Sequence, residues 1–511
     1  MITAHAVPFR VNVTKAGNKL GITIPHITDG SPKRSVVRLT IANQSGRVSF
    51  MALAAPWIAI PARICTELGL LYEDALSVLE LKPIQPHSRA AFKTEGEMVD
   101  MRSVIPATST SGYPMYVDEY EEGQVPWLRI WYCHPRGAAR QVTLRRYLEV
   151  AKLGRLLGQL QAEGDKRSSR VGFKNSAIAE HADLTLGLLE LGVPSRLIHA
   201  RCVFNPGKSS LEQAHEYAEQ YRNATGIAIE NFDAIEAMKG AIAADTVVRS
   251  STLASILLSA MDEVRRGSYR HNSLRPNFLA KLLSGDGSLD VRRTPKRLDV
   301  RLTLVDRDTE ALQDYAELLS QEGFKAKVHP ERIMVRAYCT WLNLLRLYEI
   351  GAFKNGRNWV KLLCAIKITT QGRENRGYKR IQELSEADII TSDDVSAKYA
   401  VGRRSSNLWI HSMERKGLIE NISTLCHAGR KAYRVTRRGK EIAKLLRSAE
   451  KDYDEITKQK ENKDPYVILD ETKRRGKTSG NRELKGHIFG PTALNTLKIE
   501  RIGAKKLNST E

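Results

Sequence analysis

Apolar and polar residues alternate with a period of two along much of the first 85 residues. Such alternation predicts strands with one buried face. Residues 57–70 interrupt it with a short strand, a helical turn that begins at a proline and a closing glycine. We therefore expect a β-rich domain over residues 1–85. Its main predicted strands are Val11 to Ile24, Val36 to Ile41, Val48 to Leu53 and Leu76 to Leu81.

The pattern changes twice between residues 86 and 160. Residues 86–140 are rich in Pro, Ser, Thr and aromatic residues and contain one strand candidate, Trp127 to Tyr132, so they form a connector or a β extension of the first domain. From Gln141 the spacing of Leu144, Leu148, Leu153 and Leu157 indicates a helical period.

Two nine-residue stretches then share one pattern. Each is an apolar helical segment whose eighth residue is an acid and whose ninth is a glycine, and we expect the two acids to meet at matching helix ends. The stretches are Leu156 to Gly164, ending in Glu163-Gly164, and Leu279 to Gly287, ending in Asp286-Gly287.

The elements after each stretch indicate a repeat. After Gly287, two strands, a helix over Thr309 to Glu322, two more strands and a helix over Trp341 to Ile350 give the order α-β-β-α-β-β-α. After Gly164, a short strand at Val171 to Asn175 is followed by a helix at Ile178 to Leu191 and a strand at Arg196 to Phe204, with later helices. We place the two halves at residues 141–268 and 269–370.

Composition favours a polyanion as the partner and argues against zinc-ribbon, disulfide-rich and membrane-spanning proteins. The 511 residues hold 80 Lys and Arg against 58 Asp and Glu, a net charge of +22, which favours a polyanion. The six cysteines show no CxxC spacing, so neither a zinc ribbon nor a disulfide framework is expected. Apolar runs fall short of the ~20 residues needed to cross a bilayer, and the first ten residues lack a secretory pattern. We expect a cytoplasmic protein with no membrane partner.

The two nonapeptides and the elements around them resemble the LAGLIDADG homing endonucleases. The resemblance implies an α+β fold: a duplicated αββαββα core whose sheets form a saddle on double-stranded DNA. It implies that Glu163 and Asp286 are catalytic and bind Mg²⁺ or Mn²⁺, and that Lys354 is a catalytic lysine, with Lys361 in reserve. The internal repeat implies a monomer.

The resemblance also implies which residues contact DNA. The two halves depart from the family's pattern in different ways. Lys281 replaces the small residue expected at a close helix crossing. Only residues 165–170 separate Gly164 from the next strand, and we identify no catalytic lysine in the first half. The DNA-facing residues expected in the second half are Arg292, Arg293, Lys296, Arg297 and Arg301.

Two further modules resemble DNA-binding domains. Residues 1–85 resemble AbrB-like swapped-hairpin domains. Residues 378–449 resemble a winged helix-turn-helix, with a recognition helix from Arg403 to Lys416 whose core side includes Leu408. A basic, flexible tail is expected over residues 450–511. The DNA contacts expected from the winged helix are Arg403, Arg404, Ser406, Asn407 and His411, with Arg430 and Lys431 from the wing.

These features predict a site-specific endonuclease that hydrolyses phosphodiester bonds of double-stranded DNA with a divalent metal. Two alternatives stay open. The first is a LAGLIDADG-derived transcription regulator that does not cut. The second is an RNA-splicing maturase, for which RNA is the partner.

Overall fold

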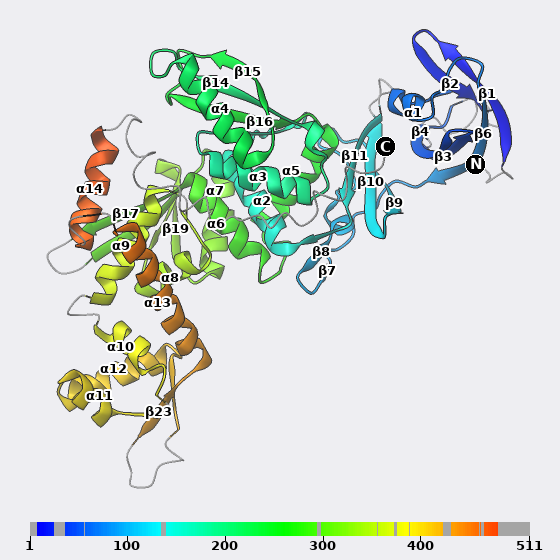
Figure 1. Cartoon of the computed structure of the whole chain (residues 1–511). Coiled ribbons are helices and arrows are strands. Elements are labelled where there is room, and N and C mark those ends of the chain that lie inside the picture. Colours follow the sequence, from blue (N-terminus) through cyan, green and yellow to red (C-terminus); the bar gives the residue numbers. More distant parts are fainter. Residues whose placement is uncertain are drawn as a thin grey trace. The chain divides into compact units, whose positions relative to one another are not determined.

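The computed structural model describes residues 8–24, 36–55, 57–133, 139–293, 298–354, 356–371, 376–387, 389–422, 431–458, 460 and 464–478. They form a mixed α+β protein (Figure 1) with two compact units. Unit 1 comprises residues 1–203, 215–233 and 244–278, and unit 2 comprises residues 204–214, 234–243 and 279–511. No helix within the described ranges is long and apolar enough to cross a membrane.

The N-terminal residues form a six-stranded sheet in the order β4-β3-β6-β1-β2-β5. The stretch predicted as one strand from Val11 to Ile24 is a hairpin, because Gly17 takes a left-handed φ of +56° that a turn requires. Alternate residues such as Val13, Ile22 and Leu39 are buried in its core. The elements are β1 (Phe9–Ala16), β2 (Lys19–Thr23), β3 (Val36–Asn43), β4 (Gly46–Leu53), β5 (Trp57–Ala59), α1 (Ala62–Glu67) and β6 (Ala75–Ile84).

Two three-stranded sheets follow, in the orders β11-β10-β9 and β12-β8-β7. The helical period predicted from Gln141 is wrong up to residue 149: Leu144 pairs with Leu128 and Leu148 with Val99 in these sheets. A spacing of four residues suits one face of a helix and one face of a strand alike. The elements are β7 (Thr94–Glu95), β8 (Met98–Asp100), β9 (Tyr116–Glu122), β10 (Val125–Cys133), β11 (Ala139–Arg145) and β12 (Tyr147–Glu149).

The first half departs from the predicted αββαββα order. Its sheet has the order β13-β16-β14-β15, so the first strand pairs with the last one rather than with the next strand in sequence. The helix α3 coincides with the helix predicted at Ile178 to Leu191. The elements are α2 (Val150–Glu163), β13 (Val171–Asn175), α3 (Ile178–Glu190), β14 (Ile198–Phe204), α4 (Leu211–Thr225), β15 (Ile229–Ala234), β16 (Ile242–Val248) and α5 (Ser251–Arg265).

The second half has the predicted element order. Its antiparallel sheet runs β17-β18-β20-β19, with helices α7 and α9 packed on one face. The elements are α6 (Leu274–Asp286), β17 (Gly287–Arg293), β18 (Leu298–Val305), α7 (Thr309–Gln321), β19 (Lys325–His329), β20 (Met334–Tyr338), α8 (Trp341–Glu349) and α9 (Arg357–Gln371).

The C-terminal residues form helices around a small sheet, β21-β23-β22. The tail predicted from residue 450 is wrong as far as residue 478, because helix continues to Ile456 and a further helix buries Ile468 and Leu469. Residues 479–511 lie outside the described ranges. The elements are α10 (Arg376–Leu384), β21 (Ile390–Thr391), α11 (Ser392–Tyr399), α12 (Arg403–Arg415), β22 (Ile419–Asn421), β23 (Ala432–Val435), α13 (Arg437–Ile456) and α14 (Pro465–Thr478).

Helix α13 is shared by the C-terminal elements and the second half. It begins directly after β23, and its later turns contact α8 and α9. Lys367 of α9 lies 2.6 Å from the carboxylate of Glu450, and the Tyr348 hydroxyl of α8 lies 2.8 Å from that of Asp452.

Helix α2 packs very closely against the first turns of α6, within unit 1. A Cβ atom at Gly154 would lie 2.5 Å from the carbonyl oxygen of Leu274, and one at Gly158 would overlap the carbonyl oxygen of Phe278. Arg155 donates a hydrogen bond of 2.9 Å to Asn277 beside this contact. Two glycines four residues apart therefore let the backbones meet.

We expect Gly158→Ala to destabilise α2 and the start of α6 by about 1–3 kcal/mol, because the added methyl must displace backbone. Hydrogen exchange of peptides covering both segments measures this. The matched control is Gly187→Ala on α3, whose Cβ would sit 3.4 Å from Leu156, an ordinary contact. The control should be neutral or slightly stabilising, since alanine favours helix. Equal effects of the two substitutions would contradict the close packing.

Candidate functional site

The two acids of the nonapeptides stand at helix ends that are built alike. Glu163 is the last residue of α2 and Asp286 the last of α6. At each following glycine, Gly164 and Gly287, a Cβ atom would overlap the carbonyl oxygen four residues earlier in its own helix. Glycine has no Cβ atom and so avoids this overlap. The glycine that follows each acid therefore has a steric cause in both halves.

Glu163 lies in a partly buried setting in unit 1. The side-chain amide of Asn175 donates a hydrogen bond of 2.6 Å to its Oε2. Burial raises the pKa of Glu163, the bond from Asn175 opposes that shift, and the nearby charge of Glu180 adds to it. The carboxylate is thus held by a neutral amide in surroundings that disfavour its charge, and a bound cation would relieve this.

A buried polar chain fixes Asn175. Its carbonyl oxygen lies 2.9 Å from Nε2 of His181, and Nδ1 of His181 lies 2.7 Å from the hydroxyl of Thr246. Burial lowers the pKa of His181, so its neutral form donates from Nε2 to the carbonyl and accepts at Nδ1. The hydroxyl of Tyr221 lies 2.7 Å from that of Thr246 and ends the chain. Sequence reasoning missed these residues, which no motif marks.

Lys166 is a lysine of the first half that sequence reasoning also missed. Its ammonium donates hydrogen bonds to the carbonyl oxygens of Leu160 and Gln161, at 2.9 and 2.6 Å. These carbonyls belong to the last turn of α2, whose dipole favours a cation. Lys166 therefore caps the helix that ends in Glu163.

The end of α6 is anchored to the turn before α9, within unit 2. The backbone N–H of Phe353 donates to the Ser284 hydroxyl at 2.9 Å, and Lys354, which follows, is exposed. Lys361 of α9 donates to the carbonyl oxygen of Leu289 at 3.1 Å and to Asn358 at 3.0 Å. Both candidate lysines thus belong to segments bonded to residues close in sequence to Asp286.

The face of the second-half sheet opposite α7 and α9 is strongly basic. Alternation buries Leu289, Leu302 and Val335 beneath the helices and leaves the residues between them on the other face, which we call the open face. On it, Lys327 stands directly opposite Arg336. Like charges in that position repel, which favours a polyanion ligand. The charged residues of the open face are Arg292, Arg301, Lys325, Lys327, Arg336, Asp290 and Asp299.

The open face includes only part of the predicted basic set. Arg292 pairs with Asp290 at 2.7 Å and Arg301 with Asp299 at 2.6 Å. The bond to Asp299 raises the pKa of Arg301. Arg293, by contrast, has the register of the helix-covered face, and its guanidinium lies over the ring of Tyr466. Lys296 and Arg297 lie outside the described residues.

The corresponding surface in the first half is balanced in charge. Lys174 of β13 stands opposite Asp245 of β16. Arg201 of β14 donates to Asp245 at 2.7 Å and to Asp233 at 2.8 Å. Two cations therefore face two carboxylates, and this sheet lacks the basic surplus of the second.

Helix α12 exposes Arg403, Arg404, Asn407 and His411, four of the residues predicted to contact DNA. The prediction for Ser406 is wrong: its side chain is fully buried and lies 2.7 Å from the hydroxyl of Ser396 on α11. Leu408, predicted on the core side, is instead 63% exposed. Lys431 is exposed beside β23, and Arg430 lies outside the described residues.

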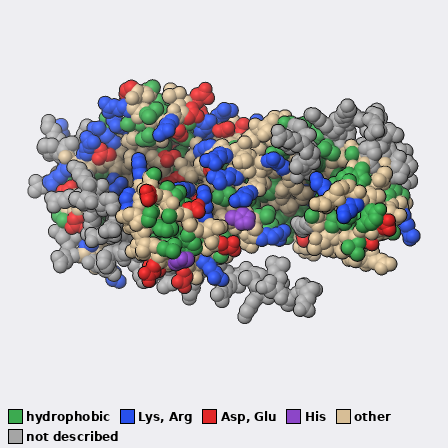
Figure 2. Space-filling view, turned by 90° about the horizontal axis from the view of Figure 1, so that it is seen from above, with side chains coloured by type: hydrophobic (Ala, Val, Ile, Leu, Met, Phe, Trp, Pro, Cys, Tyr) green, Lys and Arg blue, Asp and Glu red, His purple; other side chains and the backbone are tan. Residues whose placement is uncertain are grey.

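On the face drawn in Figure 2, Lys and Arg side chains are scattered over the surface with Asp and Glu among them. Within the described part of the chain, no three His, Cys, Asp or Glu side chains come together as a metal site.

No protein-family model matches the chain, and no curated protein matches it either. Among solved structures, a lysine-to-alanine mutant of I-SmaMI, a LAGLIDADG homing endonuclease, is similar at 11% identity. The similarity covers 46% of this chain and 96% of that one, with a TM-score of 0.25.

The raised pKa of Glu163 predicts a pH dependence of stability. The folded protein holds the proton of Glu163 more tightly than the unfolded chain, so this residue costs stability as pH rises from its ordinary pKa of 4.5 through the raised value. Glu163→Gln should therefore gain stability relative to wild type at pH 7 and lose that gain near pH 4. Thermal unfolding of both proteins at several pH values measures the difference. A gap that does not change with pH would contradict the raised pKa.

Proposed function

We propose that this chain is a LAGLIDADG-type DNA endonuclease that hydrolyses phosphodiester bonds of double-stranded DNA with Mg²⁺ or Mn²⁺. The observation that carries the proposal is the open face of the second-half sheet, where five Lys and Arg side chains lie with two aspartates on the sheet that begins directly after Asp286. A basic sheet surface suits the phosphate backbone.

The proposed chemistry assigns one acid to each half. Glu163 presents a carboxylate with Oε2 held by Asn175, and Asp286 ends α6 immediately before β17. Carboxylate oxygens suit a hard cation that keeps several waters and binds substrate phosphates, so these residues fit Mg²⁺. Such an ion supplies a water of lowered pKa and neutralises charge at the scissile phosphate. In this scheme, Lys354 stabilises negative charge on the phosphate.

The remaining modules supply recognition in this proposal. The order α10-β21-α11-α12-β22-β23-α13 suits a winged helix-turn-helix in which α12 lies in the major groove. Arg403, Arg404, Asn407 and His411 would then contact phosphates and base edges. The N-terminal sheet is assigned to an AbrB-like DNA-binding domain, and the two halves in one chain make the active species a monomer.

A second candidate function is a DNA-binding regulator that does not cut. The charge balance of Lys174, Arg201, Asp233 and Asp245 favours it, because a first-half sheet without basic surplus attracts DNA weakly. Cleavage tests separate the two candidates.

We expect the wild-type protein to cut one site in a library of plasmids with Mg²⁺ and only to bind it with Ca²⁺. Glu163→Gln and Asp286→Asn should each stop cleavage of one strand and leave nicked circles, which gel electrophoresis resolves. Glu219→Gln, at an exposed acid of α4, is the control and should cut normally. Specific binding without any nick would favour the regulator, and cutting by the double variant would overturn the assignment of the acids.

The open face predicts a difference in DNA affinity between the halves. Replacing Lys325 and Lys327 together by Gln should lower the slope of log K against log salt by about 1.8, because each phosphate contact releases about 0.9 of a counterion. Lys174→Gln should change the slope little, since Asp245 already faces that lysine. Fluorescence anisotropy with duplex DNA measures both slopes. A larger loss for Lys174→Gln would place the DNA on the other sheet.

A further inference from the structure

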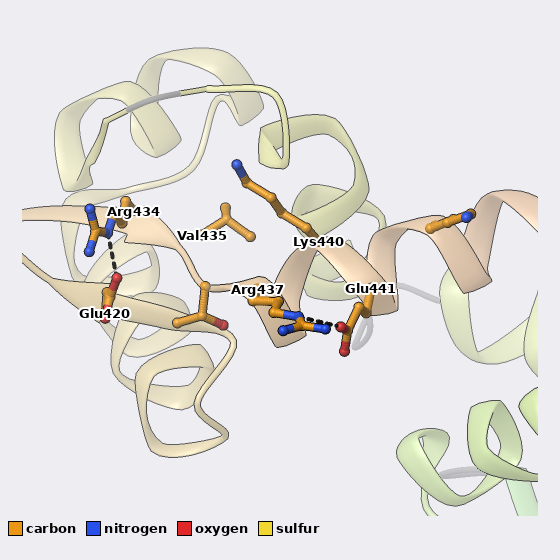
Figure 3. A pocket seen from close by; sticks show the side chains of 8 residues that line it. Glu420, Arg434, Val435, Arg437, Lys440 and Glu441 are labelled. Carbon is orange, nitrogen blue, oxygen red and sulfur yellow. Dashed lines mark hydrogen bonds and ion pairs between the residues drawn. The ribbon is translucent and has the colours of Figure 1, made fainter. Parts of the chain in front are cut away.

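A shallow groove of about 520 Å³ lies where β22 and β23 meet the first turns of α13 (Figure 3). We call it the α13 groove. It is formed by residues other than the exposed side chains of α12. The charged residues that line it are Arg434, Arg437, Lys440, Lys444, Glu420 and Glu441.

The groove carries a surplus of two positive charges. Glu420 forms an ion pair with Arg434, and Glu441 pairs with Arg437 at 3.1 Å. Both acids are therefore engaged by arginines. Lys440 extends away from these two pairs (Figure 3). Lys444, one helical turn further, is exposed on the same side of α13.

The backbone of the groove is held firmly in place. Gly439 lies so close to Leu418, the residue before β22, that a Cβ atom at Gly439 would overlap the carbonyl oxygen of Leu418. The Thr436 hydroxyl accepts the N–H of Gly439 at 3.1 Å and donates to the carbonyl oxygen of Gly417 at 2.7 Å. The lysines thus project from a fixed support, which lowers the entropy lost when they bind a ligand.

We propose that the α13 groove binds the phosphate backbone of duplex DNA, independently of sequence. This rests on the proposed function, since it assumes that the protein binds duplex DNA. Lys440 and Lys444, in addition to the two arginines paired with acids, suit two neighbouring phosphates, and none of the residues that line the groove has an aromatic ring on which a base could stack. The groove would add affinity without adding sequence preference.

The test compares Lys440→Gln/Lys444→Gln with the wild-type full chain on a 30-base-pair duplex of random sequence. Two lost phosphate contacts should lower the slope of log K against log salt by about 1.8 and weaken binding at 0.1 M salt by roughly tenfold or more. Lys451→Gln, an exposed lysine further along α13, is the matched control and should keep the wild-type slope. Glu441→Gln should act in the opposite direction and tighten binding, because it releases Arg437.

The outcomes separate this proposal from the function on which it rests. If the wild type binds no duplex DNA, the proposed function fails. If it binds and the double lysine variant keeps the slope of the Lys451→Gln control while unfolding at the wild-type temperature, the groove assignment alone is wrong. A loss confined to a single-stranded RNA probe would also overturn it, and would favour RNA as the partner.

Discussion

The close approach of α2 to the start of α6 is the constraint on which the position of the helix end at Glu163 depends. A helix can come within backbone contact of another only where side chains are missing, and Gly154 and Gly158 provide that gap. The contact fixes α2 along its axis and so fixes the position of its last residue, Glu163. The polar chain through Asn175 and His181 then orients the carboxylate from the side of the sheet. Packing places the helix end, and hydrogen bonds place the charged group.

The element order of the second half could be predicted from sequence because two of its three strand pairings, β17 with β18 and β19 with β20, join strands that follow one another in the chain. Each of its hairpins joins consecutive strands, and the alternation of buried and exposed residues is regular through β18 and β20. In the first half the strands and helix predicted as far as Phe204 coincide with β13, α3 and β14, but the sheet order was not predicted, because β13 pairs with β16, about seventy residues later, and nothing local marks that partner. The motif acids were found by repetition, whereas Asn175 and Thr246 are ordinary polar residues whose role exists only once the sheet has formed.

Errors on α12 have a simple geometric origin. Successive side chains of a helix are rotated by about 100° around its axis. A small error in assigning the buried face therefore exchanges an exposed and a buried position. Ser406 and Leu408 were exchanged in this way. The sequence also does not tell whether an arginine lies among acids or on a basic surface. Arg201 and Arg301 look alike in sequence, yet the first faces two aspartates across its sheet and the second lies on a surface with a basic surplus.

Helix α13 fixes the spacing between the C-terminal elements and the second half, both of unit 2. Its 20 residues form one continuous helix of about 30 Å, held at one end by β23 and along its later turns by α8 and α9. Such a helix sets both the distance and the relative rotation between the elements at its two ends. Inserting one residue at its middle would lengthen it by about 1.5 Å but turn everything beyond by about 100°. Inserting a whole turn, about 3.6 residues, would lengthen the helix and nearly restore the original rotation, so the spacing of the two groups of elements can change more easily by whole turns of this helix than by single residues.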